Sequence, residues 1–292
     1  MRKFPFVTID VFASRALEGN QLAVFTDARG LSDVELQDIA RETRLSETTF
    51  IFPRDAATER ADGIKVRIFT VAEEMPFAGH PTLDTAAVIA SANNVDDVAL
   101  DLKVGKIPVS FKSTPDGRFG EMTQRDPQFG KTHDANTIAN LIGIPVAEID
   151  PSLPIQTVST GFAFAIVPLR SLATLEKLEF DLKQAAAYLA KTDARLFFFV
   201  TRDTGGEPGL RARMIFYGGE DPATGSASGC TAAWMVKHGV AKPEEQVLIL
   251  QGIEMKRPSR IFVRASLDGT RVHNVRVGGY CAEVMRGDLT LP

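Results

Sequence analysis

Two short stretches of the sequence contain residue types that can move protons. The first, PFAGHPTLDTAAV, carries His80, and the second, PATGSASGCTAAW, carries Ser226. Two carboxylates, Glu220 and Asp221, stand directly before the second stretch. A histidine, a hydroxyl and carboxylates grouped in polar turns are side chains that general acid–base catalysis uses.

The second stretch has the pattern of a helix N-terminus. Gly225 lets the backbone turn, and Ser226 is predicted to cap the helix by accepting a hydrogen bond from an N–H of its first turn. Lys237, His238 and Gly239 provide a basic last turn and a C-terminal glycine. Because the first N–H groups of a helix have no partner within it, such an end can receive an anion or a developing negative charge. The alternative is an ordinary capped helix.

The two stretches are copies of each other. Their matching residues are all separated by 146 positions, which is half of the 292-residue chain. An internal duplication predicts two related lobes, each with a strand, a polar turn and a helix, whose helix N-termini face one cleft. The matched pairs are Glu74 and Glu220, Pro76 and Pro222, Gly79 and Gly225, and, upstream, Arg67 and Arg213.

The copies differ at the polar positions that matter most for chemistry. His80 occupies the place of Ser226, and Met75 occupies the place of Asp221. A site assembled from two halves needs such asymmetry, although a purely structural repeat can diverge in the same way.

The composition is that of a soluble globular protein large enough for two domains. Of its residues 44% are hydrophobic and 24% are charged, and the formal net charge of −4 gives no electrostatic reason to expect nucleic acid or an anionic membrane as partner. Cys230 and Cys281 are too few for a disulfide framework or a paired-cysteine metal site. Without a basic-then-apolar leader or an apolar run long enough to span a membrane, we expect a cytoplasmic protein.

Strand and helix patterns alternate along both halves. The final segment, CAEVMRGDLTLP, is predicted to return to the first lobe, which gives domains 1–118 plus 280–292, and 119–279. A capping box of Ser32 and Glu35 predicts a helix that ends near Arg44. The other predicted strands are 4–12, 21–25, 48–52, 64–70, several within 96–119, 158–169, 196–201, 210–216 and three after residue 239, and the other predicted helices are 81–90, 134–143, 171–178, 181–191 and 230–236.

Glu47 precedes a predicted strand, and His80 precedes a predicted helix. Glu47 opens the run ETTFIF, where a carboxylate is either a solvated edge residue or a general base at the rim of a sheet. His80 precedes Pro81, which suits the first position of a helix. The positive end of the helix dipole disfavours imidazolium, so we expect a neutral His80 ring that can donate or accept a proton. The other three histidines are interpreted as structural.

Motifs for several other chemistries are absent from the sequence. The segment GSASG places Ala227, not a serine, at its centre, so it is no nucleophile elbow. The turn before Ser226 lacks the spacing and the lysine of a phosphate loop, and neither a dinucleotide fingerprint nor a zinc motif is present. The remaining groups form acid–base equipment that requires no cofactor and no metal.

At these residues the sequence resembles the PhzF-like family of phenazine-biosynthesis isomerases, which shares its fold with diaminopimelate epimerase. The resemblance implies an α/β (α+β) fold with two pseudo-symmetric lobes from internal duplication, each a curved, mostly antiparallel β-sheet around a central helix. It also implies a homodimer and a cofactor-free site in the cleft. The matching blocks cover nearly the whole chain and are DVFASRALEGNQLAVF, RLSETTFIF, RIFTVAEEMPFAGHPTLD, GGEDPATGSASG and VRVGGYCAEV.

The resemblance also implies residue roles. The family's general base and acid falls on Glu47, and the residues that assist it fall on His80, Asp221 and Ser226. The cysteine pair of the related epimerases is replaced here by His80 and Ser226, so a two-cysteine mechanism is not available. The residues expected to bind substrate are Asn20, Gly79, Pro81, Gly225 and Ala227.

Three residues depart from the family pattern beside the expected cleft. They are Gln21, Val71 and Asp84, the last in place of a usual glycine. None of them is one of the four catalytic positions, so they bear on which substrate is bound.

The sequence therefore predicts an isomerase that moves a proton within a small carboxylated cyclic or unsaturated metabolite, as in isomerases of trans-2,3-dihydro-3-hydroxyanthranilate. Glu47 is expected to remove and return the proton. Two alternatives stay open. One is a metabolite-binding protein with the same cleft and no turnover, and the other is a hydrolase that uses Ser226 as nucleophile with His80 and Asp221.

Overall fold

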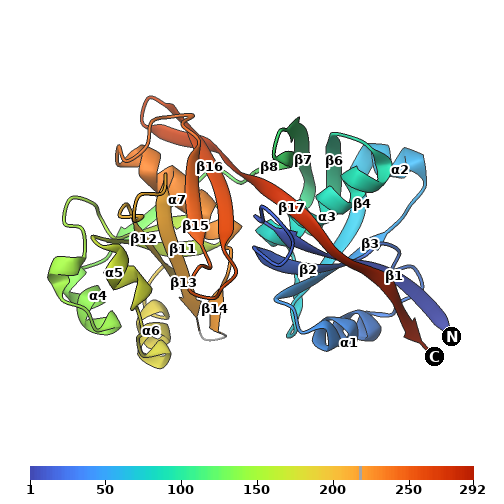
Figure 1. Ribbon diagram of the computed structural model, residues 1–292, viewed down its shortest axis with the longest axis horizontal. Coiled ribbons are helices and arrows are strands. Elements are labelled where there is room, and N and C mark those ends of the chain that lie inside the picture. The colour runs from blue at the N-terminus through green and yellow to red at the C-terminus, as the bar shows by residue number, and fades with distance from the viewer. Residues whose placement is uncertain (217–218) are drawn as a thin grey trace. The chain divides into compact units, whose positions relative to one another are not determined.

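The computed structural model describes residues 1–216 and 219–292, and the chain divides into two compact units. Unit 1 comprises Met1–Met122 and Gly278–Pro292, and unit 2 comprises Thr123–Val277. Strand β17 (Arg271–Leu291) pairs antiparallel with β1 (Arg2–Val11), from Arg2↔Leu291 to Val11↔Cys281. The two ends of the chain therefore lie side by side in unit 1 (Figure 1).

Unit 1 is a closed sheet wrapped around one helix (Figure 1). In chain order its further elements are β2 (Asn20–Phe25), α1 (Asp33–Thr43), β3 (Glu47–Phe52), α2 (Ala56–Asp62), β4 (Ile64–Phe69), β5 (Glu74–Met75), α3 (Gly79–Asn93), β6 (Asp97–Leu102), β7 (Gly105–Thr114) and β8 (Gly117–Thr123). The sheet order is β1, β2, β3, β4, β6, β7, β8, and β17 closes it by pairing with both β8 and β1. The strand pairs β2–β3 and β4–β6 are parallel. The pairs β1–β2, β3–β4, β6–β7, β7–β8 and β1–β17 are antiparallel.

Most residues of helix α3 are buried, on all sides of the helix. Helix α3 therefore lies in the interior of unit 1. Helix α1 instead covers the outside of the sheet with one apolar face, formed by Leu36, Ile39 and Ala40. Its predicted capping box is confirmed, since Ser32 and Glu35 bond each other's backbone N–H groups. The predicted end at Arg44 is confirmed as well.

Unit 2 repeats this plan around α7 (Gly225–Lys237), which is also buried on all sides. The sheet order is β9, β10, β11, β12, β13, β15, β16, with β11–β12 and β13–β15 parallel. The bounds of the elements are β9 (Gln128–Thr132), α4 (Ala135–Ile142), η1 (Val146–Glu148), β10 (Gln156–Ser159), β11 (Ala163–Leu169), α5 (Leu172–Glu176), α6 (Leu182–Leu189), β12 (Leu196–Thr201), β13 (Leu210–Phe216), β14 (Gly219–Asp221), β15 (Val247–Gln251) and β16 (Ser259–Asp268).

The same ion pair recurs before each central helix and confirms the predicted duplication. In unit 1 the guanidinium of Arg67 donates two hydrogen bonds of 2.8 Å to the Glu74 carboxylate, which joins β4 to β5. In unit 2 Arg213 bonds Glu220 in the same way at 2.8 Å and joins β13 to β14. Bidentate arginine–carboxylate pairs fix geometry strongly. Each one therefore holds the hairpin that leads into a central helix.

Several predicted elements are wrong in detail. Segment 158–169 is not one strand, because Gly161, with φ of 137°, turns the chain between β10 and β11. The helix predicted over 81–90 begins earlier, at Gly79, which makes His80 its second residue. Helix α2 was not predicted, and its seven residues include no buried one that could give an apolar pattern.

Ser226 does not cap α7. The helix begins at Gly225 with Thr224 at the N-cap, and Ser226 is its second residue. The Thr224 hydroxyl is turned away from the helix and donates to Asp221 Oδ2 at 2.6 Å, so the helix has no side-chain cap. The predicted basic end is confirmed, with Lys237 in the last turn and Gly239 in the left-handed region at φ of 70°.

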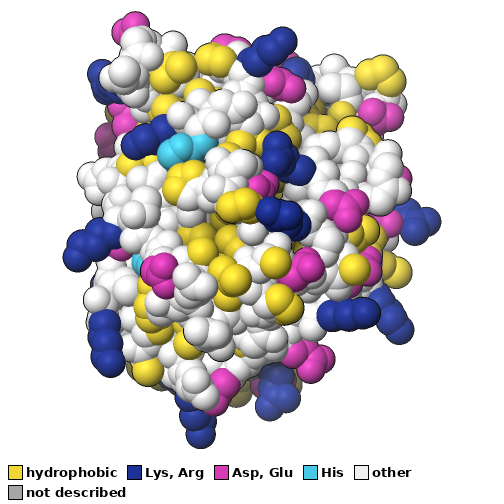
Figure 2. All heavy atoms as spheres, turned by 90° about the vertical axis from the view of Figure 1, so that its left-hand side faces the viewer, with side chains coloured by type: hydrophobic (Ala, Val, Ile, Leu, Met, Phe, Trp, Pro, Cys, Tyr) yellow, Lys and Arg dark blue, Asp and Glu magenta, His cyan; other side chains and the backbone are white. Residues whose placement is uncertain are grey.

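The surface seen from the side of α4 and α6 in unit 2 carries Lys and Arg side chains interspersed with Asp and Glu, with hydrophobic side chains between them (Figure 2). Among the described residues, no helix combines the length and the apolar character that crossing a membrane requires.

Candidate active site

In unit 1 the structure brings Glu47 and His80 together. Glu47 is the first residue of β3 and His80 the second residue of α3, and Nε2 of His80 lies 3.3 Å from Oε2 of Glu47. The two atoms are in close contact without the alignment of a hydrogen bond. Both side chains are largely buried, with 8% of His80 and 18% of Glu47 exposed.

A buried pair of hydroxyls holds β3 against α3. Thr49, which shares a face of β3 with Glu47, has its Oγ1 2.8 Å from Oγ1 of Thr85 on α3, and both residues are fully buried. This contact lies about one helical turn beyond His80. It therefore fixes the strand and the helix that carry Glu47 and His80.

Asn20, a predicted substrate-binding residue, contacts the other side of the imidazole. Its Nδ2 lies 3.5 Å from Nδ1 of His80, and Asn20 is 2% exposed. Gly19 makes the tight turn before it, with φ of 68° and no room for a Cβ, which would lie 2.1 Å from the carbonyl oxygen of Val11. If the amide donates to Nδ1, the ring proton is on Nε2 and faces Glu47.

The predicted neutrality of His80 agrees with its surroundings. Burial lowers the pKa of His80 to about 3, so the imidazole is uncharged at neutral pH. The physical cause is loss of hydration, whereas the sequence argument invoked the helix dipole. A neutral ring beside a carboxylate can act as a hydrogen-bond donor through Nε2–H.

Three further titratable side chains, Asp84, Asp10 and Cys281, interact within unit 1. Asp84, one turn after His80 on α3, is fully buried, and Asp10 of β1 is 2% exposed. Burial raises the pKa of Asp84 well above its ordinary value, the Cys281 thiol works against this rise, and the charge of Asp10 adds to it. Burial and Asp84 together raise the pKa of the Cys281 thiol. The sequence identified Asp84 as a departure from the family pattern, and did not predict its contacts with Asp10 and Cys281.

In unit 2 Asp221 lies at the end of β14, three residues ahead of the N-cap of α7. Its Oδ2 accepts a hydrogen bond of 2.6 Å from Thr224 Oγ1. Gln251, at the end of β15 and fully buried, donates to the Asp221 carbonyl oxygen at 2.7 Å. Gln251 was not among the predicted site residues, although a glutamine that ends the apolar run VLIL is a usable signal.

Both central helices begin without a side-chain cap. The predicted binding residues Gly79 and Pro81 are buried in the first turn of α3, and Gly225 and Ala227 are buried in the first turn of α7. Ser226 is partly exposed in the first turn of α7. The free N–H groups of these first turns, to which Pro81 contributes none, can bind an anion.

The predicted site residues thus fall into two groups. Glu47, His80 and Asn20 meet in unit 1, and Asp221 lies next to the start of α7 in unit 2. That the two groups share one cleft stays a prediction. The block GGEDPATGSASG begins with Gly218, which lies outside the described residues. Within the described residues no three His, Cys, Asp or Glu side chains cluster in a way that could hold a metal ion.

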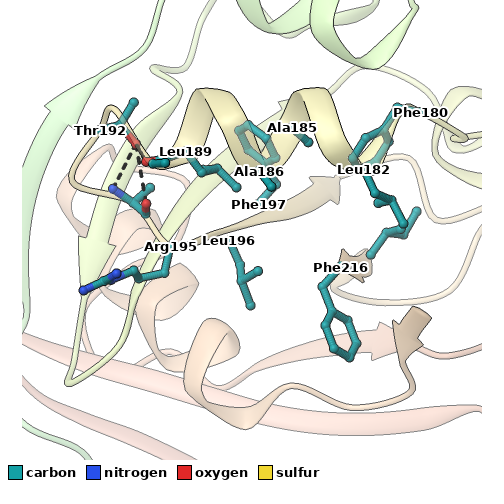
Figure 3. Close-up of a pocket in the computed structure, with 13 residues that line it drawn as sticks. Phe180, Leu182, Ala185, Ala186, Leu189, Thr192, Arg195, Leu196, Phe197 and Phe216 are labelled. Atoms are coloured by element: carbon teal, nitrogen blue, oxygen red, sulfur yellow. Dashed lines mark hydrogen bonds between the residues drawn. The ribbon is translucent and has the colours of Figure 1, made fainter. Parts of the chain in front are cut away.

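A cavity of about 260 Å³ lies elsewhere in unit 2. Figure 3 shows Ala185, Ala186 and Leu189 on α6 above Leu196 and Phe197 of β12. Its walls are mainly apolar and contain none of the predicted catalytic residues. This cavity therefore lacks the acid–base groups that proton transfer needs.

Comparison with known proteins defines the family. The model of phenazine biosynthesis-like proteins, PhzC-PhzF, matches residues 9–287. The chain belongs to this PhzC-PhzF family. Trans-2,3-dihydro-3-hydroxyanthranilate isomerase of Pseudomonas aeruginosa is 34% identical to it over 286 residues, covering 97% of this chain and 98% of the relative. An uncharacterized isomerase of Mesorhizobium japonicum is 31% identical over 300 residues, covering 97% and 98%.

Solved structures agree with the family assignment. A predicted epimerase from Pseudomonas aeruginosa matches with a TM-score of 0.84 and 33% identity, covering 99% of this chain and 100% of the other. The Bacillus anthracis phenazine biosynthesis protein of the PhzF family matches with a TM-score of 0.88 and 24% identity over 100% of both chains, which supports the fold. A hydroxyproline epimerase from Agrobacterium vitis shares the fold alone, at a TM-score of 0.64 and 11% identity, covering 99% of this chain and 92% of the other. This PhzC-PhzF chain is thus an isomerase with a diaminopimelate epimerase-like fold.

Proposed function

We propose that the protein is a cofactor-independent isomerase that moves a proton within a small carboxylated cyclic or unsaturated metabolite. The observation that carries the proposal is the buried approach of His80 Nε2 to Glu47 Oε2 at 3.3 Å. The similarity to trans-2,3-dihydro-3-hydroxyanthranilate isomerase supports that compound as the first substrate to test.

Glu47 is the proposed base and acid. Its carboxylate removes a proton from a carbon that conjugation makes acidic, and the electron pair of the broken C–H bond moves into the conjugated system. The protonated Glu47 carboxyl exchanges its proton with solvent and then gives a proton to another carbon. Substrate and product are isomers, and no electrons leave the molecule.

His80 is the proposed hydrogen-bond donor to the substrate. Because its pKa of about 3 keeps the ring neutral at working pH, the ring does not neutralise the Glu47 carboxylate as a cation would. Asn20 on the opposite side of the ring fixes its orientation through the Nδ1 contact. A donor held in place before reaction stabilises charge that develops on the substrate.

Unit 2 is proposed to bind the polar groups of the substrate. Asp221 would hold an amino or hydroxyl group, and Ser226 with the first N–H groups of α7 would hold a carboxylate. The uncapped start of α7 supports this role, because the Thr224 hydroxyl is engaged with Asp221 and leaves those N–H groups without a side-chain acceptor.

The proposal is tested by NMR in deuterated water. Trans-2,3-dihydro-3-hydroxyanthranilate and a panel of cyclic amino and hydroxy acids are incubated with the wild-type protein, with Glu47→Gln, and with Glu42→Gln. Glu42 is an exposed residue of α1 and serves as the matched control. We expect isomerisation with solvent deuterium incorporation by the wild type and by Glu42→Gln, and loss of both in Glu47→Gln.

Retention of the wild-type rate in Glu47→Gln would refute the role of Glu47. Binding of a compound without turnover or deuterium incorporation would instead support a metabolite-binding protein with the same residues. Covalent labelling of Ser226 by an acylating reagent, with release of product, would support the hydrolase alternative.

A further inference from the structure

The loop from Asp221 to Thr224 is held by two fully buried polar side chains of the neighbouring strands. Gln251 Nε2 donates to the Asp221 carbonyl oxygen at 2.7 Å, and its Oε1 accepts from the Thr224 N–H at 3.0 Å. Ser259 Oγ donates to the Pro222 carbonyl oxygen at 2.7 Å. Three peptide groups of the loop are therefore bonded from β15 and β16, and the loop cannot shift without breaking these bonds.

The backbone beside Gln251 also packs tightly against this loop. Gly252 has φ of 75°, and a Cβ there would lie 2.5 Å from the Pro222 carbonyl oxygen and 2.4 Å from that of Arg257. Only glycine allows this approach. The end of β15, which carries Gln251, thus packs directly against the loop from Asp221 to Thr224.

Gln251 also determines which way the Thr224 hydroxyl points. Gln251 Nε2 donates to Thr224 Oγ1 at 2.9 Å, so this oxygen acts as an acceptor toward Gln251. The hydroxyl proton is left for Asp221 Oδ2, which lies 2.6 Å away. The amide therefore positions Asp221 twice, once through its backbone carbonyl and once through its carboxylate.

The duplication supplies an internal comparison for these two residues. Ile249 pairs with Leu210 in unit 2, as Leu100 pairs with Ile64 in unit 1. Two residues further along, Gln251 stands where unit 1 has the buried Leu102. In the following strands, the register partner of Gln251 is Ser259, and that of Leu102 is Gly105.

The lobe with Met75 in the place of Asp221 thus has a leucine and a glycine where the lobe with Asp221 has two buried polar side chains. A buried amide is costly unless it is hydrogen-bonded, and leucine fills the same place in unit 1. The two polar side chains thus occur in the lobe that has the aspartate, although both lobes have the same fold.

We propose that Gln251 is a positioning residue of the candidate active site, supported by Ser259, and that it holds Asp221 and the start of α7 in their working geometry. The inference rests on the proposed function, in which Asp221 and α7 bind the substrate. Gln251 itself does not contact the reacting atoms in this proposal.

Two substitutions of Gln251 and one control substitution distinguish a positioning role from an effect on folding. Gln251→Leu copies Leu102 of unit 1 and removes every bond of the amide. Gln251→Glu keeps an acceptor for the Thr224 N–H but removes the donor to Asp221 and Thr224. Gln246→Leu, at an exposed position just before β15, is the matched control.

Two quantities are measured on each full-length variant: hydrogen exchange of the segment 219–228 by mass spectrometry, and kcat and KM for solvent deuterium incorporation into trans-2,3-dihydro-3-hydroxyanthranilate. We expect Gln251→Leu to speed exchange of the Thr224 amide about tenfold or more and to lower kcat about 100-fold. Gln251→Glu should keep that amide protected yet lose most of kcat, a result that a purely structural role does not produce. Gln246→Leu should match the wild type in both.

A second pair of variants tests the hydroxyl. Thr224→Ser should retain kcat because it keeps the donor to Asp221, and Thr224→Val, of similar size, should lose it. Unchanged Thr224 amide exchange in Gln251→Leu, or wild-type kcat in Gln251→Glu, would overturn the proposal. If the wild type itself did not act on the compound, the substrate of the proposed function would be refuted, while the exchange data would still decide whether Gln251 holds the loop.

Discussion

His80 Nε2 and Glu47 Oε2 lie 3.3 Å apart, and they reach this distance from different elements, the start of α3 and the start of β3. The bonded hydroxyls of Thr49 and Thr85 hold those elements together. Because His80 is neutral at physiological pH, the contact joins a hydrogen-bond donor to a carboxylate rather than two opposite charges. Several testable consequences depend on this arrangement.

The first concerns the protonation of His80. Because burial lowers its pKa to about 3, the ring should stay neutral, with its proton on Nε2, from pH 5 to pH 8. Nitrogen NMR of ¹⁵N-histidine-labelled protein measures this, and the His80 signals are assigned by their loss in His80→Gln. A titration of His80 between pH 6 and pH 7 would contradict the prediction.

The lowered pKa of His80 also makes the stability of the protein depend on pH. The unfolded chain binds a proton at His80 near pH 6.5, whereas the folded protein does so only near pH 3, so stability is fully present above pH 6.5 and is lost as pH falls through this window. Relative to His80→Gln, the wild type should lose up to about 1.4 kcal/mol of unfolding free energy per pH unit there. Urea unfolding of both proteins between pH 7 and pH 4 checks the slope.

The contribution of Asp84 to stability should depend on pH in the opposite direction. Its folded pKa is raised, mainly by burial, so its contribution to stability is fully present below the unfolded value near 3.8 and is lost as pH rises through the folded value. Asp84→Asn removes the ionisable group without changing its size. We expect this variant to gain thermal stability over the wild type as pH increases from 4 to 8, and a pH-independent difference between the two melting temperatures would argue against a raised pKa.

The duplicated arginines allow a comparison within one protein. Arg213 is 9% exposed and, besides bonding Glu220, donates to the carbonyl oxygens of Leu175, Glu176 and Leu178, whereas Arg67 is 22% exposed. Arg213→Lys keeps the charge but loses the bidentate geometry, and we expect it to cost about 2–4 kcal/mol. Arg67→Lys should cost about 1 kcal/mol. Equal losses of stability in thermal unfolding would show that burial does not set the difference.

The sequence predicted the features that depend on neighbouring residues or on the repeat. The separation of 146 positions indicated two lobes, and the capping residues of α1 and α4 placed both helices, with Asp134 and Gly143 at the ends of α4. Glu47 was identifiable as the residue that begins a strand. Such signals lie within a few residues of the element that they define.

Contacts between distant residues were not predictable in this way. Ser226 was predicted to cap α7, but the residue that decides the matter, Gln251, is bonded to Thr224 from 27 positions away. Likewise, burial raises the pKa of Asp84, and the two side chains that modify this pKa, Cys281 and Asp10, come from β17 and β1. Periodicity shows which face of an element is buried, and not which polar groups meet there.

The central claim is that the Glu47 carboxylate transfers the proton, and a substitution series at this residue tests it most directly. The rate of solvent deuterium incorporation into trans-2,3-dihydro-3-hydroxyanthranilate is measured for the wild type, Glu47→Asp and Glu47→Gln, with circular dichroism confirming that each is folded. The account predicts that Glu47→Asp, whose carboxylate is set back by one methylene, loses about 10- to 100-fold, and that Glu47→Gln loses about 10⁴-fold or falls to the rate without enzyme. A folded Glu47→Gln protein that incorporates deuterium as fast as Glu47→Asp would contradict the claim.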